Sequence, residues 1–457
     1  MTGAAAPAAP AAPPSRTFVA LFFLLVLAAL LFSDKGQIAG DGEVRWGALV
    51  ALMDEGRHTP DRYTLEMPIA AAPLWAAGAA AARVEGAPGA ARLDTIRRVV
   101  QRFNKLVAFA IAVWLFRRLR GLGLDEFAAA GSVLILLFAS LLVPHSKDFY
   151  SESLWTLLAC VALGQLADGP ARTRAGDAAL AVAAALAIPL NPLLCPVIFV
   201  TSAMLFFLEG EEGRSAARRG AVLASAGAAL GLGLALSENL LRRGALLDFG
   251  YAGEGFTAPF FEGLFGQLFS PARGALFYLP LFFVGILLLG RRARPDVRRF
   301  TLAGATFGVL LVLAYAKWHA WHGMTYWGPR FLLPLSIFGA AFVALAWRES
   351  PRPSWRTALV LLVAISYAAY KVGVGVGVVP LRACLLPDPA RLSCYWDWAR
   401  LPLASWLSPG DLASMLSHRS TAVEAGTLVL FAVLVALTGR GRSRRAIFPQ
   451  GPAPRSG

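Results

Sequence analysis

The chain has 457 residues, of which 57% are hydrophobic and 16% are charged, and its mean hydropathy is +0.59. Soluble domains average about 25% charged and about 45–50% apolar residues, so this composition excludes a soluble globular enzyme and a disordered chain. The formal charge of +15 would favour nucleic-acid binding in a soluble protein. Here arginines cluster between long apolar segments, which is typical of a polytopic membrane protein and indicates no nucleic-acid partner.

Apolar segments suited to crossing a bilayer recur along the whole chain. A transmembrane helix needs about 20 mostly apolar residues, and by this measure the sequence predicts an all-α polytopic fold with about 12 such helices. Several of the segments are short. They are 17–33, 99–116, 126–143, 153–168, 175–190, 191–208, 219–236, 275–290, 299–316, 330–347, 357–378 and 421–438.

Clusters of arginine between these segments predict the topology. Short loops rich in Lys and Arg face the cytoplasm. If the N-terminus is inside, every cluster falls on the cytoplasmic side, and the opposite loops are longer and hold most of the acidic residues. We therefore expect a multi-pass protein of the inner (plasma) membrane with both termini in the cytoplasm. The clusters lie at 117–120, 172–174, 214–219, 291–299, 348–356 and 440–445.

The same pattern predicts one transmembrane domain between two cytoplasmic tails. An Ala- and Pro-rich disordered tail (1–16) precedes the domain (17–438), and a basic tail (439–457) follows it. Three connections are long enough to form elements on the external face. These external loops are 34–98, 237–274 and 379–420.

One segment in the first external loop tests this topology. Met67–Ala82 is uncharged and apolar, but it is short and contains Pro68 and Pro73. If it crossed the membrane, all later arginine clusters would move to the outer face. We therefore expect an interfacial or re-entrant helix here.

The four cysteines are consistent with this predicted topology but do not test it strongly. Cys160 and Cys195 lie in apolar segments and are expected to be small core residues. Cys384 and Cys394 share an external loop, where an oxidising compartment permits a disulfide, but the sequence leaves open whether it forms. The Cys and His spacings do not suggest a zinc site.

The first polar cluster on the predicted external face is Gly40-Asp41-Gly42-Glu43, shortly after the first apolar segment. Flanking glycines let the backbone bend sharply and bring a carboxylate close to the membrane surface. The next stretch, Val44–Met53, is amphipathic and is expected to lie flat on the bilayer. Asp41 and Glu43 are thus candidates to meet a substrate at the lipid head groups.

A second cluster, in the short connection before the helix predicted at 153–168, combines a base, a cation, acids and hydroxyl groups. A plain linker does not need this chemistry. Its candidate residues are His145, Lys147, Asp148 and Glu152. For Glu152 a second interpretation stays open, because an acidic residue at a helix start also stabilises the helix dipole.

A third cluster mixes aromatic residues with cations after the predicted helix 299–316. An interfacial aromatic belt explains its tryptophans but not its cations. Cations at membrane depth usually pair with an anion, and a lipid phosphate is the available one. The candidates are Lys317, His319, His322 and Arg330, and Arg273 in Phe269–Gly274 is a fourth site of the same type.

Together the predicted external face has carboxylates near the first helix and cations near later ones. Such a site can deprotonate a hydroxyl group while it neutralises a phosphate leaving group. Sugar transfer from a lipid-phosphate donor requires these two roles. The phosphate leaves readily, so a separate general acid is unnecessary.

These motifs resemble the GT-C superfamily of integral-membrane glycosyltransferases, which use polyprenyl-phosphate-linked sugars. The resemblance rests on the acidic motif in a long first external loop and on the Ser-x-Glu-type element Ser151–Ser153. It also rests on two later segments, Phe269–Pro280 and Tyr326–Phe331, which are similar to those of bacterial phospholipid-carrier-dependent members. Each motif is short, but their order and outward placement are consistent.

The resemblance implies roles for three acids. Asp41 would be the base that activates the acceptor hydroxyl. Asp148 would be a second acid near the reaction centre and, with Glu43, a ligand for a metal. Some members use a divalent cation such as Mg²⁺, Mn²⁺ or Ca²⁺ and others use none, so the metal stays open.

The resemblance also implies the partners. These are a polyprenyl-phosphate-linked sugar, membrane lipids, and an acceptor that is a glycan, a lipid or a protein. Many members have a soluble C-terminal external domain, where this chain has only the loop 379–420. The sugar and the acceptor therefore stay open.

The alternative is a polytopic transporter or a flippase for lipid-linked sugars. About twelve helices with both ends inside would suit a secondary transporter. Against it, the sequence shows no two-half repeat, and the acids gather in loops and not within the predicted spans, where an ion pathway needs them.

The topology makes a direct prediction for cysteine labelling. In intact cells, a membrane-impermeant thiol reagent should label Lys147→Cys and should not label Arg294→Cys, because the two positions lie on opposite sides of the membrane. Labelling of position 294 from outside would contradict the topology.

Overall fold

The computed structural model describes most of the apolar part of the chain. The described residues are 15–33, 36–251, 254–289, 293–323, 328–349, 359–360, 362–367, 393–396, 423 and 425–435. Within them the regular structure is helical, apart from an isolated bridge between Gln37 and Asp148. The tails predicted at 1–16 and 439–457 lie outside these residues, except that the first helix already begins at Arg16. Most of the loop 379–420 lies outside them too.

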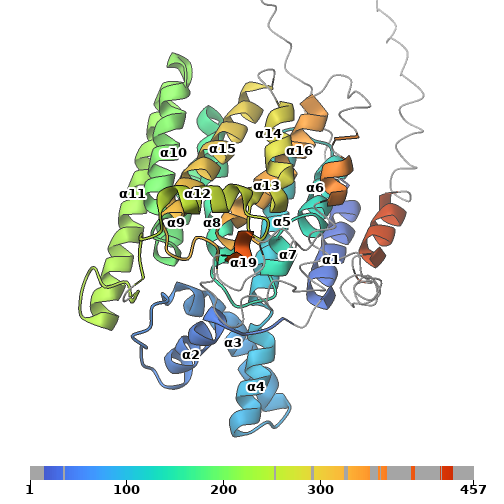
Figure 1. Ribbon diagram of the computed structural model, residues 1–457. Coiled ribbons are helices and arrows are strands. Elements are labelled where there is room, and N and C mark those ends of the chain that lie inside the picture. Colours follow the sequence, from blue (N-terminus) through green and yellow to red (C-terminus); the bar gives the residue numbers. More distant parts are fainter. Residues whose placement is uncertain are drawn as a thin grey trace, which may run out of the picture.

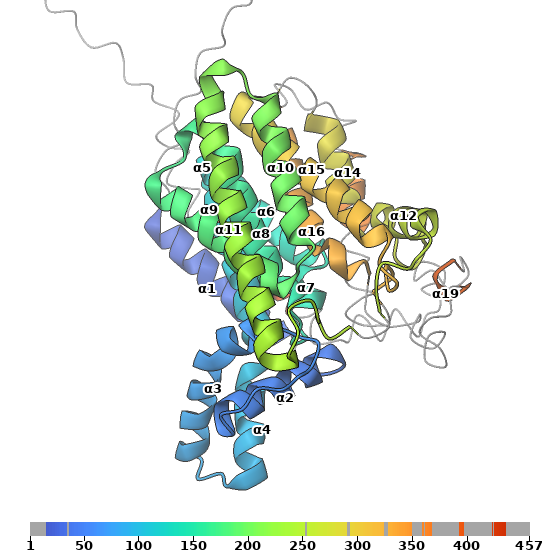
Figure 2. The same cartoon turned by 90° about the vertical axis from the view of Figure 1, so that its left-hand side faces the viewer.

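A bundle of long, apolar helices forms the body of the molecule (Figures 1 and 2). Each predicted span from 17–33 to 330–347 coincides with one or two helices. The bundle helices are α1 (Arg16–Ser33), α5 (Phe103–Gly121), α6 (Glu126–Phe138), α8 (Glu152–Asp168), α9 (Arg174–Leu190), α10 (Leu194–Leu208), α11 (Glu211–Arg243), α14 (Pro280–Leu289), α15 (Pro295–Ala316) and α16 (Leu333–Glu349).

Seven helices in the described part of the chain are, by length and composition, apolar enough to cross a membrane, and four further apolar helices are shorter. Parts of the spans predicted at 357–378 and 421–438 lie outside the described residues. The fold is therefore that of an all-α membrane protein.

Shorter elements connect the bundle helices, and their bounds refine the predicted ones. The predicted span 275–290 is divided into α13 (Ala275–Tyr278) and α14, because Pro280 cannot continue the first helix. The predicted loop 237–274 contains the last turns of α11 and a further helix, α12 (Phe260–Phe269), which lies across the bundle (Figure 1). The remaining short helices are α7 (Leu142–His145), η1 (Gly169–Ala171), η2 (Arg330–Leu332) and α19 (Ser393–Trp396).

Small residues let the bundle helices approach closely around aromatic side chains. The rings of Phe282 and Phe342 lie 5.6 Å apart, as do those of Phe300 and Phe338. A Cβ atom on Gly285 would lie 2.5 Å from the Cβ of Phe342, so glycine permits this contact between α14 and α16. Small residues at helix contacts are the usual means of packing in membrane proteins.

The predicted cytoplasmic arginines gather at one end of the bundle. They form ion pairs and hydrogen bonds between loops that are far apart in the sequence. The start of α1 lies at the same end, because the Ser15 backbone N–H donates to Glu126 at 2.7 Å. The contacts that join these loops are Arg118–Asp168, Arg299–Glu209, Arg294–Glu349 and the bonds from Arg294 and Arg348 to the Leu122 carbonyl.

Three helices form a separate unit beyond the opposite end of the bundle (Figures 1 and 2). These are α2 (Asp41–Asp54), α3 (Glu66–Val84) and α4 (Gly89–Val100). The rings of Trp46 in α2 and Trp75 in α3 lie 5.5 Å apart. Although α3 is long and apolar enough to cross a membrane, it packs against α4 outside the bundle.

The contact between α3 and α4 predicts opposite effects for two glycine substitutions. A Cβ atom on Gly78 would lie 2.7 Å from the Cα of Ile96, whereas one on Gly47 would meet nothing within 4 Å. Gly78→Ala should therefore force α3 and α4 apart and lower the free energy of unfolding by about 1–3 kcal/mol. Gly47→Ala should raise it by up to about 1 kcal/mol through helix propensity. Thermal unfolding of the purified variants in detergent measures both, and a stable Gly78→Ala variant would contradict the packing.

Candidate functional site

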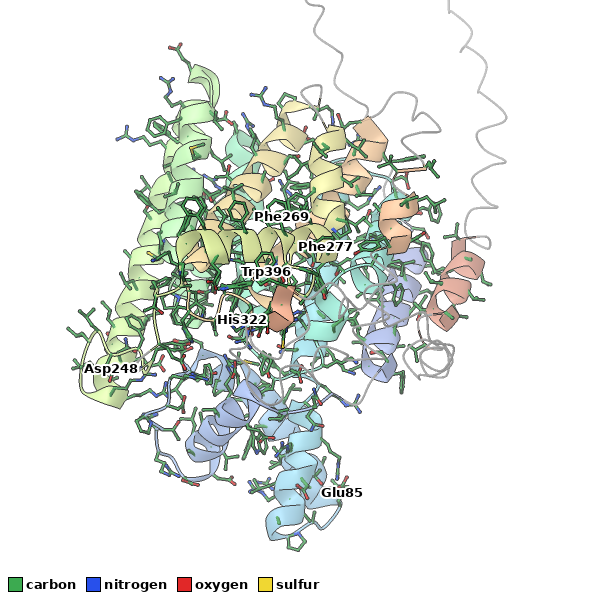
Figure 3. The ribbon with its side chains drawn as sticks, viewed as in Figure 1. Glu85, Asp248, Phe269, Phe277, His322 and Trp396 are labelled. Atoms are coloured by element: carbon green, nitrogen blue, oxygen red, sulfur yellow. The ribbon has the colours of Figure 1, made fainter. Side chains whose placement is uncertain are left out.

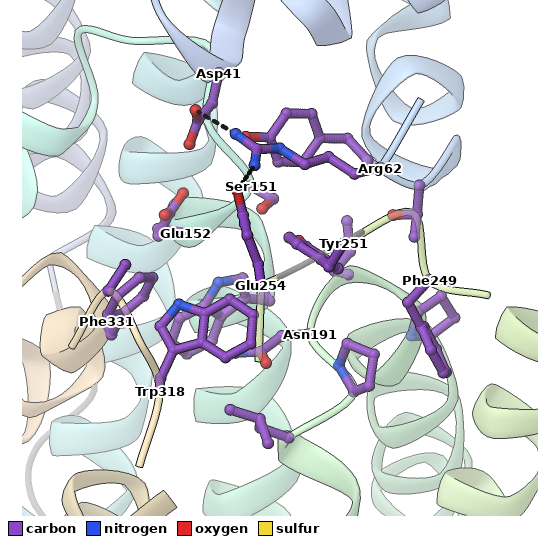
Figure 4. A pocket seen from close by; sticks show the side chains of 18 of the residues that line it. Asp41, Arg62, Ser151, Glu152, Asn191, Phe249, Tyr251, Glu254, Trp318 and Phe331 are labelled. Atoms are coloured by element: carbon purple, nitrogen blue, oxygen red, sulfur yellow. Dashed lines mark hydrogen bonds and ion pairs between the residues drawn. The ribbon is translucent and has the colours of Figure 1, made fainter. Parts of the chain in front are cut away.

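A pocket with a volume of about 710 Å³ lies where the bundle meets the α2–α4 unit (Figure 4). Segments from the whole chain contribute to its wall. They are the start of α2, the α2–α3 connection, the start of α8, the α9–α10 turn, the end of α11, residues from 247–251 and 254–256, Tyr315, residues 318–320, Gly323, and Arg330 with Phe331.

Gly40 sets the position of Asp41 at the start of α2. Its φ of +56° lies in the left-handed region, which glycine adopts without a steric cost. A Cβ atom here would also lie 2.7 Å from the Tyr150 hydroxyl oxygen. Gly40 therefore allows both the sharp turn and the close approach of Tyr150, and Asp41 faces the pocket.

Arg330 joins two carboxylates in the centre of the pocket. Its Nη1 lies 3.1 Å from Oδ2 of Asp41, and its Nε lies 3.5 Å from Oε1 of Glu152. The guanidinium also lies over the rings of Tyr150 and Phe331, 5.6 and 4.9 Å from their centroids. The Arg330 side chain is only 12% exposed, so water screens these contacts weakly.

The pKa of Asp41 is held below its ordinary value of 3.8. Burial alone raises this pKa, but the charge of Arg330, a hydrogen bond from Tyr63 and the charge of Arg45 together outweigh burial. Burial raises the pKa of Tyr63 far above 10, and the charge of Asp41 adds to this. At neutral pH the pocket thus holds an ionised Asp41 and a protonated Tyr63 that donates to it.

A second ionic group lies next to this one. Nη1 of Arg62 lies 2.6 Å from Oε1 of Glu254, and its Nη2 lies 3.7 Å from Oδ1 of Asp41 (Figure 4). Nε2 of His319 lies 3.7 Å from Oε2 of Glu254. Arg62 therefore connects Glu254 to Asp41 in the structure.

The opposite side of the pocket is aromatic and apolar. Trp318 contacts Tyr251 and Phe256 edge to face, with centroids 5.6 and 5.4 Å apart. Phe331 stacks on Tyr315 at 4.3 Å, and Nδ2 of Asn191 donates to the Tyr315 hydroxyl at 2.8 Å. Proline and leucine residues of the α9–α10 turn complete this wall. A charged half and an apolar half suit an amphipathic ligand.

Four of the candidate residues line this pocket. They are Asp41, Glu152, His319 and Arg330. They come from three parts of the sequence that the fold brings together. The two interpretations of Glu152 both have structural support, since Glu152 opens α8 and also pairs with Arg330.

The remaining acidic and basic candidates before α8 lie outside the pocket wall. Glu43 pairs with Arg97 of α4, and its side chain is 47% exposed. Asp148 is buried, and its backbone carbonyl accepts from Nδ2 of Asn104 at 2.5 Å. His145 is buried too, and the carbonyl of Lys147 accepts from the Gln37 backbone N–H at 2.8 Å.

Arg273 and His322 lie together in a buried cluster around Tyr395 of α19. The imidazole of His322 stacks on the Tyr395 ring at 4.2 Å, and the Arg273 guanidinium lies 5.5 Å from its centroid. Figure 3 shows His322 beside α19. Burial lowers the pKa of His322 to about 3, and the charge of Arg273 adds to this effect, so His322 is neutral at pH 7. The Ser270 hydroxyl donates to the Tyr395 carbonyl at 2.6 Å, so this cluster holds α19 in place.

Lys317 lies outside the pocket wall, and so do the described cysteines. Lys317 is exposed outside the pocket wall, and its carbonyl accepts from the Ala258 backbone N–H at 3.1 Å. Cys160 is a buried free thiol, as expected, whereas the free thiol Cys195 is only partly buried. Cys394 is disulfide-bonded, whereas Cys384, its candidate partner, lies outside the described residues.

Several pocket residues were not among the site residues predicted from the sequence. Asn191 had a visible signal, since it is a polar residue between prolines in an otherwise apolar stretch. The others lie in segments predicted to be external loops, where charged and aromatic residues are common, and only the fold brings them together. They are Arg45, Arg62, Tyr63, Arg243, Tyr251 and Glu254.

The described residues do not gather ligands for a metal ion. No three His, Cys, Asp or Glu side chains among them come close enough together to hold one. Asp41 and Glu152 share the cation Arg330, and Glu43 and Asp148 lie outside the pocket wall. The described residues thus do not bring Glu43 and Asp148 into the pocket wall, and the use of a metal stays a prediction.

Known proteins were compared with the chain and its structure. No protein-family model and no curated protein matches the sequence. Two solved structures are similar in fold, and both are ArnT from Cupriavidus metallidurans. The one bound to undecaprenyl phosphate has a TM-score of 0.52 and 14% identity, over 90% of this chain and 77% of that chain. The apo state has a TM-score of 0.51 and 14% identity, over 90% and 76%.

This similarity defines the class of fold. ArnT is a GT-C glycosyltransferase, and this chain shares its fold over 90% of its length. The all-α membrane fold predicted from the sequence is thereby confirmed, whereas the number of twelve helices and the details of the loops stay predictions. At 14% identity the comparison concerns the fold and assigns no residue of the pocket.

The Arg330 ion pairs predict a pH-dependent loss of stability. Arg330→Gln should lower the free energy of unfolding by about 3 kcal/mol at pH 7, because it leaves the buried Glu152 without its cation and Asp41 with only its more distant contact to Arg62. The lowered pKa of Asp41 means that its pair with Arg330 contributes stability above pH 3.8 and loses it as the pH falls through the folded-state pKa. The difference from the wild type should therefore shrink below pH 3.8.

Thermal unfolding between pH 3 and pH 7 checks this, with Arg57→Gln as the control. Arg57 pairs with Glu55 at an exposed site, where loss of the pair should change little. Equal stability of the Arg330→Gln variant and the wild type at pH 7 would contradict the role given to Arg330.

Proposed function

We propose that the protein is a membrane glycosyltransferase that moves a sugar from a polyprenyl-phosphate donor to an acceptor hydroxyl. The observation that carries the proposal is the pocket itself, which places an ionised carboxylate among arginines at one end of a GT-C fold. The neighbour ArnT was solved with undecaprenyl phosphate bound, which supports a lipid-phosphate donor. Glycan, lipid and protein acceptors, and hexosyl or pentosyl donors, all remain within the proposal.

In the proposed reaction Asp41 is the general base. The acceptor oxygen attacks the anomeric carbon, the bond from that carbon to the phosphate oxygen breaks, and the hydroxyl proton passes to Asp41. Its lowered pKa keeps Asp41 ionised and ready to accept the proton. Arginines that line the pocket stabilise the charge that develops on the phosphate.

The amphipathic pocket suits the two parts of such a donor. The aromatic half, with Trp318, Tyr251 and Phe331, offers flat faces against a sugar ring or the first prenyl units. The charged half offers arginines for the phosphate. Membrane lipids surround the exposed apolar faces of the bundle helices.

We place the pocket on the external face of the inner membrane. The arginine-rich end of the bundle is then cytoplasmic under the positive-inside rule, and both termini are cytoplasmic. The α2–α4 unit lies at the outer surface, where α3 is an interfacial helix and not a span. A donor presented in the outer leaflet reaches the pocket from there.

The transporter alternative has less support. It requires charged groups along the middle of the spans. The charged groups of the pocket lie where the bundle meets the α2–α4 unit.

The central prediction concerns Asp41. Asp41→Asn should lower kcat for sugar transfer by roughly 10²- to 10⁴-fold, because the amide cannot accept the proton. The assay offers the purified protein a panel of polyprenyl-phosphate sugars and measures release of the lipid phosphate. Full activity of the variant would remove Asp41 from the mechanism.

Asp54→Asn is the matched control in the same helix. Asp54 pairs with Arg92 at the far end of α2, away from the pocket wall. Its substitution should leave transfer at the wild-type level. Both variants should insert in the membrane and express like the wild type.

A further inference from the structure

Arg45 is a buried cation of the pocket, and one nitrogen of its guanidinium makes no hydrogen bond. It lies in the second turn of α2, is only 6% exposed and lines the pocket. Its Nη2 donates to the Ser151 hydroxyl at 3.1 Å, and its guanidinium lies 3.9 Å from the centroid of the Tyr63 ring. Its Nη1 has no hydrogen-bond partner, and within the described chain no carboxylate lies within 4.0 Å of it. A buried guanidinium with no carboxylate within ion-pair distance is costly, and an anionic ligand would lower that cost.

The other three arginines of the pocket are differently engaged. Arg62 and Arg330 each lie against carboxylates. Arg243 donates to the backbone carbonyls of Asp61 and Asp248 and to the side chain of Asn239. A ligand would have to displace these internal partners. Arg45 lines the pocket too, and its Nη1 has no internal partner that a ligand would have to displace.

Ser151 brings a second donor to the same place. Its hydroxyl accepts from Arg45, and within the described residues it makes no other side-chain hydrogen bond, so its O–H remains able to donate. Ser151 is also the residue before α8, and its side chain does not cap that helix. The N-terminal N–H groups of a 17-residue helix carry partial positive charge and favour an anion.

The neighbouring carboxylates would repel an anion bound here, but their pairing with a cation weakens this repulsion. Asp41 and Glu152 are both paired with Arg330. Arg45 is four residues after Asp41, so both project from the same face of α2. The base and the anion site would then be neighbours on one rigid element.

We infer that Arg45, Ser151 and the N-terminus of α8 form the subsite for the phosphate group of the carrier lipid. The inference rests on the proposed function, because it assigns the leaving group of that reaction. The sequence predicted Arg330 as a phosphate ligand. In this proposal Arg330 instead pairs with Asp41 and Glu152. The shared chemistry is a phosphate oxygen, whether on a lipid or free in solution.

The test measures binding of undecaprenyl phosphate to purified protein in nanodiscs of a zwitterionic lipid. Arg45→Gln should raise Kd roughly 10- to 100-fold, as expected for loss of a charge-assisted hydrogen bond. Ser151→Ala should raise it roughly 2- to 10-fold, and Arg45→Lys should fall between the wild type and Arg45→Gln. Arg92→Gln, in the same α2–α4 unit but off the pocket wall, is the control and should bind like the wild type.

Two further measurements are needed. One distinguishes a loss of binding from a loss of folding, and the other distinguishes a lipid phosphate from free phosphate. The Tm without ligand shows whether Arg45→Gln is folded, and if it is not, Arg45→Lys and Ser151→Ala decide the question. A parallel titration with inorganic phosphate should give much weaker binding that also depends on Arg45.

The outcomes distinguish the two proposals. If the wild type binds undecaprenyl phosphate and a folded Arg45→Gln variant binds it equally well, the subsite is overturned and the proposed function stands. If the wild type binds no undecaprenyl phosphate, the proposed function and the lipid assignment both fail. Binding of inorganic phosphate that depends on Arg45 would then support an anion subsite for a free phosphate.

Discussion

The pocket depends on the contact of one arginine with two carboxylates. Arg330 comes from the segment before α16, Asp41 from the start of α2 and Glu152 from the start of α8. A charge that is 12% exposed gains much more from such partners than it would in water. The contact therefore joins the bundle to the α2–α4 unit at the place where the pocket forms. Loss of Arg330 would remove the cation that both carboxylates share in a weakly solvated site.

The same contact divides the charges of the pocket into two classes. Arg330 and Arg62 neutralise the carboxylates, which keeps Asp41 ionised in spite of its burial. Arg45 is left beside Ser151 with an unpaired donor. In the proposed reaction a carboxylate base and an anionic leaving group lie close together, and this separation would reduce the repulsion between the two anions. The arrangement explains why four arginines line one small pocket.

The residues that the sequence suggested for the site fall into two structural groups. Asp41, Glu152, His319 and Arg330 meet in the pocket. Arg273 and His322 instead surround Tyr395 and hold α19, although their local sequence is as rich in polar and aromatic groups. Polar residues at the predicted external face thus either bind one another to fix the loops or face the cavity. Residue type does not distinguish the two uses, because both need buried, well-paired cations.

The sequence by itself determined the class of fold, the helices from 17–33 to 330–347 and the sharing of one bundle end by the arginine clusters. Those features follow from hydropathy, which acts locally along the chain. Only the tertiary structure decided which polar residues share the cavity, because the wall combines segments as distant as Asp41 and Arg330. Contacts over such separations depend on how helices pack, and packing is set by side-chain shape across the whole bundle. For this reason Arg45 was visible in the sequence only as part of an amphipathic helix, and the fold made it a buried cation of the pocket.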